Sequence, residues 1–444
     1  MNTSRRDFLK SSAFLLGTSA SLHPLLSPSI ARAAAANAAS LPVSLPLESG
    51  WEFNRQTFGS PWEVWNLKTP GWHPIHLPHC FNHYDACDPD APAYRGQGWY
   101  RTTIRPANPC PGGRTLLHFG GAGQRTSVYA GSTLVAHNIG GYNEFVVDIT
   151  GSERNASGEI PLAILCDNSR DPHAIPSDIS DFNLYGGIYR HLRLVYVPAV
   201  AVELLHVQSS VAPGQPAQCS VLARLYNPDV LTGTLDLAFS VFAPDGSTMH
   251  TASLQLQPWQ DLRSLWQFSV PAPQLWSPAS PSLYQCTLTL HSEYGDQSVT
   301  QRFGIRHFDF QEHGPFFLNG EKLLLRGTQR HEDHAGCAAA IPDDVTRQEL
   351  KMIRDMGANF IRLAHYPQAE LVLDLCDELG LIVWEELPWC RSGVGDAQMR
   401  SNARHLLALM IEQHYNHPSI VFWSLGNEED WPNIDPGDKQ IHRA

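Results

Sequence analysis

The sequence predicts a multi-domain protein in which two β-sandwiches precede a unit of alternating strands and helices. The first observation is composition: 33 glycines and 33 prolines among 444 residues favour turn-rich β structure over long helical bundles. The second is a series of short β-prone runs, separated by Gly, Pro, Asn and Asp, that continues to about residue 307. The third is a change beyond Phe308, where short apolar runs alternate with amphipathic helical segments. A chain of this length can bury two or three separate cores.

Residues 41–197 have the strand spacing of a β-sandwich of the jelly-roll type. The strands expected there are 99–104, 115–119, 127–130, 145–147, 160–165 and 191–197. Residues 198–307 form a second all-β block, and its size of about a hundred residues is typical of an immunoglobulin-like β-sandwich. The strands expected in it are 202–211, 217–226, 233–242 and 283–291.

From residue 308 to residue 444 the pattern predicts the N-terminal half of a (β/α)8 TIM barrel. Strands are expected at 323–327, 359–363, 381–384 and 420–425, and helices at 343–356, 368–379 and 396–415. Asp343 is the expected N-cap of the first helix, and Gly357 and Gly380 are expected to end the first two helices. A closed barrel needs eight strands, and the pattern gives four. We therefore expect that the sequence ends after the fourth barrel strand.

The N-terminus has the order of segments that marks a twin-arginine export signal. Arg5 and Arg6 are followed by Phe-Leu-Lys, then by a modestly apolar stretch and by small residues around Ala33. Glycine, histidine and proline interrupt the apolar stretch, so no membrane span is expected in the mature protein. We expect residues 1–33 to be removed and the protein to be periplasmic or secreted. Replacing both arginines with lysine should leave the precursor inside the cell, and an unchanged exported yield on fractionation would refute the signal.

The charge balance and the cysteines limit the partners that the sequence suggests. The net charge of −13 argues against nucleic acid, because an acidic surface gains nothing from counterion release on a phosphate backbone. The nine cysteines are scattered without Cys-x-x-Cys pairs, so the sequence predicts neither a cysteine metal site nor a disulfide framework.

The run 423–428, Trp-Ser-Leu-Gly-Asn-Glu, carries the clearest chemical signal in the chain. It ends a short apolar run, so Asn427 and Glu428 should lie at the C-terminal end of a barrel strand, where parallel barrels keep their catalytic groups. A carboxyl group there can act as a general acid in glycoside hydrolysis, which usually takes two carboxyl groups. The structural alternative is that Asn427 caps a following helix and Glu428 favours that helix's positive end.

Several motifs, taken together, resemble glycoside hydrolase family 2, the family of β-galactosidases, β-glucuronidases and β-mannosidases. In the first sandwich they are 96–101 (GQGWYR) and 181–190 (DFNLYGGIYR). In the barrel region they are 325–333 (LRGTQRHED), 359–367 (NFIRLAHYP), 377–384 (DELGLIVW) and 423–428 (WSLGNE). The resemblance covers nearly everything after the signal. It implies the family's order of a sugar-binding jelly roll, an immunoglobulin-like sandwich and a barrel.

The resemblance also implies roles for five residues. Glu428 would be the acid/base, and Asn427 would bind the sugar's 2-hydroxyl, a contact that strengthens in the transition state. His331 and His365 match the family's strand-end histidines near the reacting sugar, and Asp181 matches an acidic residue that the first sandwich sends to the barrel mouth. The structural alternatives are satisfied strand-end histidines and a turn-stabilising aspartate.

No metal and no other cofactor is expected. The run His-Glu-Asp-His at 331–334 lacks the spacing of His-Glu-x-x-His and lies on a loop. Some β-galactosidases of the family hold magnesium through an acidic residue and a histidine after the third barrel strand, and Cys390 and Ser392 stand at those places here. Glu385 and Glu386 are expected to line the pocket rather than to catalyse.

The leading hypothesis is a retaining β-glycosidase, similar to β-galactosidases, that hydrolyses terminal β-linked sugars. In the family the nucleophile is a second Glu on a later barrel strand. We therefore expect the printed sequence to be a truncated form that lacks the nucleophile and does not hydrolyse glycosides alone. The alternative is a non-catalytic carbohydrate-binding protein or an inactive fragment, which would still use Asp181, His331 and His365. The expected partner is a carbohydrate, and the sequence is compatible with a homo-oligomer.

Overall fold

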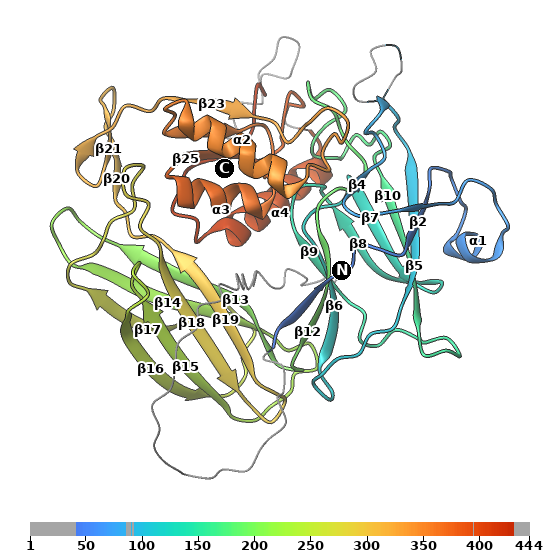
Figure 1. The fold of residues 1–444 in the computed structure, drawn as a ribbon, viewed down its shortest axis with the longest axis horizontal. Helices are drawn as coiled ribbons and strands as arrows, with labels where there is room; N and C mark the ends of the chain where they lie inside the picture. Colours follow the sequence, from blue (N-terminus) through green and yellow to red (C-terminus); the bar gives the residue numbers. More distant parts are fainter. Residues whose placement is uncertain (1–40, 86–89, 91–92, 394, 430–444) are drawn as a thin grey trace, which may run out of the picture.

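The computed structural model describes residues 41–85, 90, 93–393 and 395–429. The predicted signal peptide (1–33) lies outside these residues. Two all-β bodies come first along the chain, and the strands and helices of the last part pack above and between them in the view of Figure 1. The order of bodies expected from the sequence is therefore the order of secondary structure along the described chain.

The first body is a sandwich of two antiparallel sheets, ordered β1-β12-β6-β9 and β3-β2-β5-β10-β7-β8. The strands of the first sheet are β1 (Val43–Pro46), β12 (Leu192–Val197), β6 (Arg114–Phe119) and β9 (Phe145–Asp148). Those of the second are β3 (His73–Ile75), β2 (Trp51–Asn54), β5 (Gln97–Ile104), β10 (Ile160–Asp167), β7 (Arg125–Ala130) and β8 (Thr133–Ile139). The short strand β11 (Gly187–Ile188) pairs with β4 (His79–Cys80), and α1 (Pro61–Asn66) lies at the outer end.

This sandwich is held by side chains that alternate inward from both sheets. Trp51, Tyr100 and Phe119 are among its fully buried aromatic residues and belong to one continuous apolar core. Burial of each such ring stabilises the fold by roughly 1.5–3 kcal/mol. The sandwich is therefore a stable support for the loops that connect its strands. One of those loops, 175–185, reaches the end of the parallel sheet described below.

The second body has sheets ordered β13-β14-β17 and β16-β15-β18-β19. The strands of the smaller sheet are β13 (Ala201–Ser210), β14 (Ala217–Tyr226) and β17 (Arg263–Val270). Those of the larger sheet are β16 (Thr248–Leu256), β15 (Leu235–Phe242), β18 (Tyr284–His291) and β19 (Gln297–Phe303). Its own apolar core includes Phe239, Tyr284 and Phe303, so it does not depend on the first core for its burial.

The last part begins with a small antiparallel sheet and continues as a parallel one. The antiparallel strands are β20 (Phe308–Phe310), β21 (Phe316–Leu318) and β22 (Glu321–Lys322). The parallel sheet has the order β23-β24-β25-β26, with strands β23 (Gly327–Arg330), β24 (Phe360–Leu363), β25 (Ile382–Glu386) and β26 (Ile420–Ser424). The helices between them are α2 (Asp343–Asp355), α3 (Glu370–Leu379) and α4 (Ala397–His414).

Successive side chains of each parallel strand lie on opposite faces of the sheet. Ile361 and Leu363 of β24 and Val383 of β25 pack into the apolar cluster under α2 and α3. Arg362 and Glu386 lie on the opposite face of the same strands and bind each other. Because side chains alternate along a strand, one face of the sheet holds the helices, and the other carries the apolar Phe360 and Ile382 near the strand starts and polar groups toward the strand ends.

Two details of the predicted βα region were wrong. The strand expected at 323–327 is displaced, and β23 is Gly327–Arg330. The Asn359 side chain donates to Leu324 O (3.0 Å) and accepts from Arg326 N (2.7 Å), so it satisfies backbone groups that a longer strand would have paired. Asp343 is the first residue of α2 and not its N-cap, which is Pro342.

Asp343 instead binds His191 of the first sandwich. The two ring nitrogens of His191 face carboxylates: Nδ1 lies 2.5 Å from Glu48 Oε1 and Nε2 lies 2.9 Å from Asp343 Oδ1. Only the imidazolium form can donate from both nitrogens. The hydrogen bond to Asp343 raises the pKa of His191, with Glu48 adding to the effect and partial burial opposing it. The same contact lowers the pKa of Asp343, which Arg347 and Arg193 also lower.

This bridge predicts a pH-dependent contribution to stability. A raised histidine pKa gives stability that is fully present below the unfolded pKa of about 6.5 and is lost as pH rises through the folded pKa. The lowered pKa of Asp343 gives stability that is fully present above the unfolded pKa of about 3.9 and is lost as pH falls through the folded pKa. The difference in unfolding temperature between wild type and His191→Gln should therefore be largest at about pH 5–6 and shrink above about pH 8. For His313→Gln, whose ring is 94% exposed, calorimetry should show no such trend. Equal pH profiles for the two variants would contradict the bridge.

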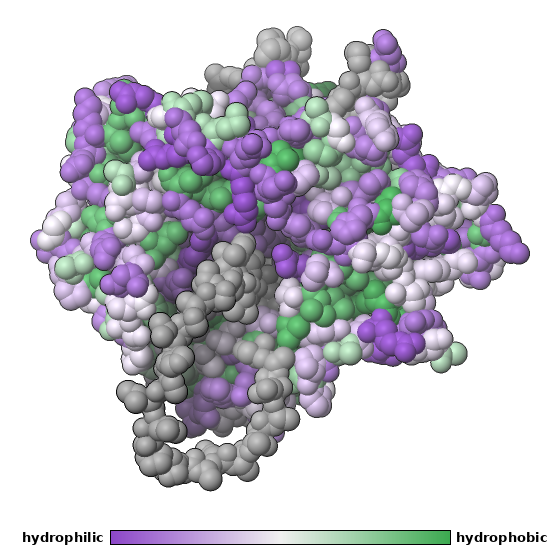
Figure 2. All heavy atoms as spheres, in the orientation of Figure 1, coloured by the Kyte–Doolittle hydropathy of each residue, from purple (hydrophilic) through white to green (hydrophobic). Residues whose placement is uncertain are grey.

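The surface in Figure 2 carries hydrophilic residues interspersed with hydrophobic ones over the visible parts of all three bodies. No helix in the described part of the chain is long and apolar enough to cross a membrane.

Candidate active site

The C-terminal ends of β23 to β26 lie side by side, and polar side chains follow each of them. The strands pair in parallel with the registers Arg330↔Leu363 and Glu386↔Ser424 at their ends. Parallel pairing places the segments after these strands at one edge of the sheet. The segment 175–185 of the first sandwich reaches the same edge.

Glu428 lies four residues beyond β26 and is exposed at this edge. Its Oε2 accepts a hydrogen bond from Arg391 Nε at 2.7 Å, and its side chain is 42% exposed. Its backbone has φ 54°, in the left-handed region that non-glycine residues rarely adopt. Glu428 thus has a fixed partner, and its carboxyl group is accessible, as proton exchange with a ligand requires.

Asn427 is held more tightly than its neighbour. Its backbone N–H donates to Trp389 O at 2.8 Å, and its carbonyl accepts from Arg391 N at 3.1 Å, so the segments 389–391 and 427 form a short parallel bridge. Its side-chain oxygen accepts from an Arg362 amino group at 2.8 Å, and its amide donates to Cys390 Sγ at 3.5 Å. Asn427 therefore belongs to the strand-end network, and the helix that it was alternatively expected to cap lies outside the described residues.

Asp181 arrives from the first sandwich and contacts the same loop. One carboxylate oxygen lies 2.8 Å from the Arg391 guanidinium, and the other accepts from Cys390 Sγ at 3.5 Å. The hydroxyl groups of Ser177 and Ser180 donate to Cys390 O at 3.1 and 3.4 Å. These bonds tie the sandwich loop to the loop after β25, so Asp181 is fixed beside the strand ends.

A charged network beneath these residues fixes His365. Glu386 is fully buried and accepts from Arg362 at 2.8–3.1 Å, from Trp384 Nε1 at 2.9 Å, and lies 2.7 Å from His365 Nδ1. Buried charges persist only where they are paired in this way. The ring of His365 is thereby held with Nε2 pointing away from Glu386.

His331 lies next to His365, with the two ring centroids 5.1 Å apart. Its Nδ1 lies 3.3 Å from the hydroxyl of Tyr366, and the ring of Phe182 packs near both histidines at 5.8–5.9 Å. Burial lowers the pKa of His331, and the neighbouring His365 lowers it further. A neutral imidazole at neutral pH can both donate to and accept from sugar hydroxyls.

The structure thus brings all five predicted site residues into one network. One branch runs from Glu428 through Arg391 to Asp181, and the other runs from Asn427 through Arg362 to His365 and on to His331. Glu386 lies below the network as the buried partner of Arg362, in keeping with a wall residue. The expectation that Glu385 lines the pocket was wrong: it lies on the helix-covered face of the sheet, 2.5 Å from His414 of α4.

Sequence reasoning missed Arg362 and Arg391. Arg362 could have been found, because an arginine among the apolar residues of a short buried strand needs an acidic partner at the strand ends. Arg391 had no such signal, since it stands in a loop and its partners are distant in sequence. Cys390 was noted only as a departure from a magnesium site.

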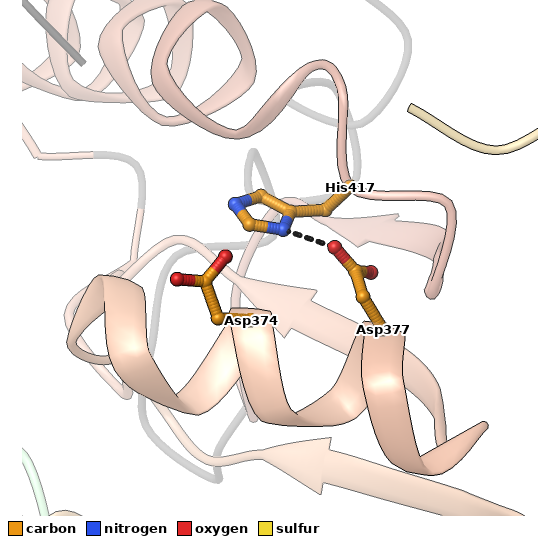
Figure 3. Close-up of side chains that lie close together, drawn as sticks. All are labelled: Asp374, Asp377 and His417. Carbon is orange, nitrogen blue, oxygen red and sulfur yellow. Dashed lines mark hydrogen bonds and ion pairs between the residues drawn. The ribbon is translucent and has the colours of Figure 1, made fainter. Parts of the chain in front are cut away.

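One cluster of candidate metal ligands occurs among the described residues, away from the network above. Asp374, Asp377 and His417 have ligand atoms within 4.8 Å of one another (Figure 3). Each is already engaged: His417 Nδ1 lies 2.6 Å from Asp377 Oδ2, Ser419 N donates to Asp377 Oδ1, and Arg302 of β19 pairs with Asp374. An arginine occupies the position where a cation would be attracted, so this donor set fits a structural junction better than a metal site.

Sequence comparison gives a family for this arrangement. The sequence model described as "Glycosyl hydrolases family 2" matches residues 200–306, and that for "Glycosyl hydrolases family 2, TIM barrel domain" matches residues 311–439. A putative beta-glucuronidase of Formosa agariphila is 39% identical over 84% of this chain and 45% of its own length. A beta-galactosidase of Thermoanaerobacter pseudethanolicus is 29% identical over 81% of this chain and 48% of its own length.

Solved structures agree with the sequence matches. The beta-glucuronidase of Parabacteroides merdae is 44% identical, with a TM-score of 0.87 over 90% of this chain and 53% of that chain. Beta-glucuronidase 2 of Bacteroides uniformis, solved covalently bound to cyclophellitol-6-carboxylate aziridine, is 29% identical, with a TM-score of 0.79 over 86% of this chain and 46% of that chain. The chain spans about half the length of these relatives. The resemblance seen in the motifs is confirmed: the chain belongs to glycoside hydrolase family 2 and has the multi-domain, β-rich fold with a TIM-barrel domain of that family.

Proposed function

We propose that the protein is a retaining β-glycosidase that hydrolyses terminal β-linked sugars. The observation that supports this most strongly is the convergence of Asn427, Glu428, His331 and His365 at one edge of the parallel sheet, with Asp181 supplied by the first sandwich. The names of the family relatives, which are beta-glucuronidases and beta-galactosidases, support the same class of reaction.

In the proposed mechanism Glu428 transfers the proton in both steps. Its carboxyl group gives a proton to the glycosidic oxygen as the bond from that oxygen to the anomeric carbon breaks, and a second carboxylate, proposed to lie on a later barrel strand outside the described residues, bonds to that carbon. The Glu428 carboxylate then takes a proton from the water that displaces the second carboxylate from the anomeric carbon. Asn427 is proposed to bind the 2-hydroxyl through its amide. His331, His365 and Asp181 are proposed to bind other hydroxyls, for which neutral imidazoles and a carboxylate are suitable partners.

We propose β-glucuronides as the first substrate class and β-galactosides as the second. Two of the beta-glucuronidases described above are 39% and 44% identical to this chain, whereas the third, like the beta-galactosidase, is 29% identical. In this proposal residues 41–197 are the sugar-binding jelly roll, 198–307 the immunoglobulin-like sandwich and 308–444 part of the barrel, with β23–β26 as its first four strands.

The proposal is tested with the protein as its host makes it. Turnover of nitrophenyl β-glucuronide and β-galactoside is measured, and the protein is incubated with cyclophellitol-6-carboxylate aziridine, after which mass spectrometry locates any labelled carboxyl group. We expect glucuronide turnover and labelling of one glutamate. Turnover of the galactoside alone would overturn the choice of sugar. Sugar binding by calorimetry with neither turnover nor labelling would refute the enzyme and support a carbohydrate-binding protein.

A further inference from the structure

Arg391 stands between two carboxylates that come from different bodies of the protein. Its Nε donates to Glu428 Oε2 at 2.7 Å, and one of its terminal amino groups lies 2.8 Å from Asp181 Oδ2. The Arg391 side chain is 24% exposed, whereas those of Glu428 and Asp181 are 42% and 33% exposed. The guanidinium is therefore the most enclosed member of the trio and bonds to both acids.

The backbone under Arg391 is fixed on both sides. Its N–H donates to Asn427 O at 3.1 Å, and the adjacent carbonyl of Cys390 accepts from Ser177 and Ser180 at 3.1 and 3.4 Å. The Cys390 thiol lies 3.5 Å from both Asp181 and Asn427. Arg391 thus projects from a segment that is bonded to the first sandwich and to the end of β26 at once.

Two residues of this contact have an uncommon backbone conformation. Arg391 has φ 58° and Glu428 has φ 54°, both in the left-handed region. A non-glycine residue in this region is held there by its surroundings at an energetic penalty, and such residues cluster at functional sites. The side chains of these two residues are bonded to each other.

We infer that Arg391 is a positioning residue that holds the acid/base Glu428 in one orientation and couples it to Asp181 across the sandwich–barrel junction. Without the guanidinium, two like charges would face each other and the exposed Glu428 carboxyl would sample several rotamers. A carboxyl group that must reach one oxygen of the substrate loses rate when it is misplaced by about 1 Å. The inference rests on the proposed role of Glu428 and adds a residue on which that role depends.

The first arm of the test does not require activity. Wild type, Arg391→Leu, Arg391→Lys and the control Arg263→Ala are treated with a water-soluble carbodiimide and glycinamide, and modification of Glu428 and Asp181 is followed by mass spectrometry. Arg263 is half exposed and pairs only with exposed Asp261 among the residues described, so its loss should change nothing at the site. Glu312, 92% exposed, serves as the internal rate reference. Arg391→Leu should speed labelling of both acids several-fold, and unchanged labelling would overturn the inference.

The second arm measures turnover of alkyl and nitrophenyl glycosides. In Arg391→Leu, kcat/KM for alkyl glycosides should fall by about 10- to 100-fold, the factor for losing one hydrogen bond to a charged group, and less for nitrophenyl glycosides. Added guanidinium ion should restore part of the loss. Arg391→Lys should lie between, because an ammonium group cannot bond both carboxylates as a planar fork does. Equal losses on both substrates, with no rescue by guanidinium, would assign Arg391 a purely structural role and overturn the inference. If wild type itself turns over no glycoside, the proposed function fails, and the labelling arm still decides the role of Arg391.

Discussion

Glu428→Gln should reduce kcat/KM for glycosides with poor leaving groups by about 10²–10⁴-fold, the usual contribution of a positioned general acid. The amide has nearly the shape of the carboxyl group but cannot give a proton to the departing oxygen. Arg391 Nε, now 2.7 Å from Glu428 Oε2, can still donate to the amide oxygen, so the side chain should keep its position. Sugar binding, measured by calorimetry, should change little.

The leaving-group dependence separates acid catalysis from other roles. Nitrophenyl glycosides need little protonation, so their first step should be far less affected than that of alkyl glycosides. Glu312→Gln is the matched control, because Glu312 is 92% exposed on the loop between β20 and β21 and should be neutral on every substrate. An equal loss on activated and unactivated substrates would remove Glu428 from the acid role.

Local sequence patterns predicted the alternation of strands and helices because they depend on neighbouring residues. The expected strand at 359–363 and helix at 396–415 correspond to β24 (Phe360–Leu363) and α4 (Ala397–His414), whose N-cap Asp396 accepts from Met399 N. The strand expected at 323–327 was displaced because the side chain of Asn359, more than thirty residues away, occupies its backbone groups. No periodicity within 323–327 contains that information.

The site also has residues that the sequence could predict and contacts that it could not. Asn427 and Glu428 could be predicted because a strand end positions them directly, and the histidines follow strand ends in the same manner. The links that fix them, from Arg362 to Glu386 and from Arg391 to Asp181, join segments that meet only in the folded chain. The order of the motifs indicated which residues lie together at the site. Only the three-dimensional contacts showed which other residues position them.

A buried ion pair joins two of the sequence motifs. Arg190 ends the motif at 181–190 of the first sandwich, and Glu332 lies in the motif at 325–333 beside the parallel sheet. Their side chains are each 6% exposed, and the guanidinium lies 2.5 Å from the carboxylate. Arg190 also donates to the carbonyls of Gly120, Tyr142 and Pro367. Burial lowers the pKa of Arg190, but Glu332, with Tyr189 and Glu144, more than offsets this, and the net pKa is raised.

Arg190→Met should therefore destabilise the protein by about 3–5 kcal/mol, because it leaves Glu332 buried without its counter-charge. Urea unfolding followed by tryptophan fluorescence measures the change, taken at the transition in which the sandwich and the βα part separate. Lys351→Met is the control, since Lys351 and Asp355 form an exposed i,i+4 pair worth only about 0.3–0.5 kcal/mol.

The double variant Arg190→Met/Glu332→Met decides whether the pair acts as a unit. Removing both charges also removes the uncompensated buried carboxylate, so the double variant should be less destabilised than the sum of the two single variants. The carbonyls of Tyr142 and Pro367 lose their donor whenever Arg190 is replaced, so the double variant should still be less stable than the wild type. If the losses of the two single variants simply add, Arg190 and Glu332 contribute independently, and the junction between the two motifs is held by packing instead of by their ion pair.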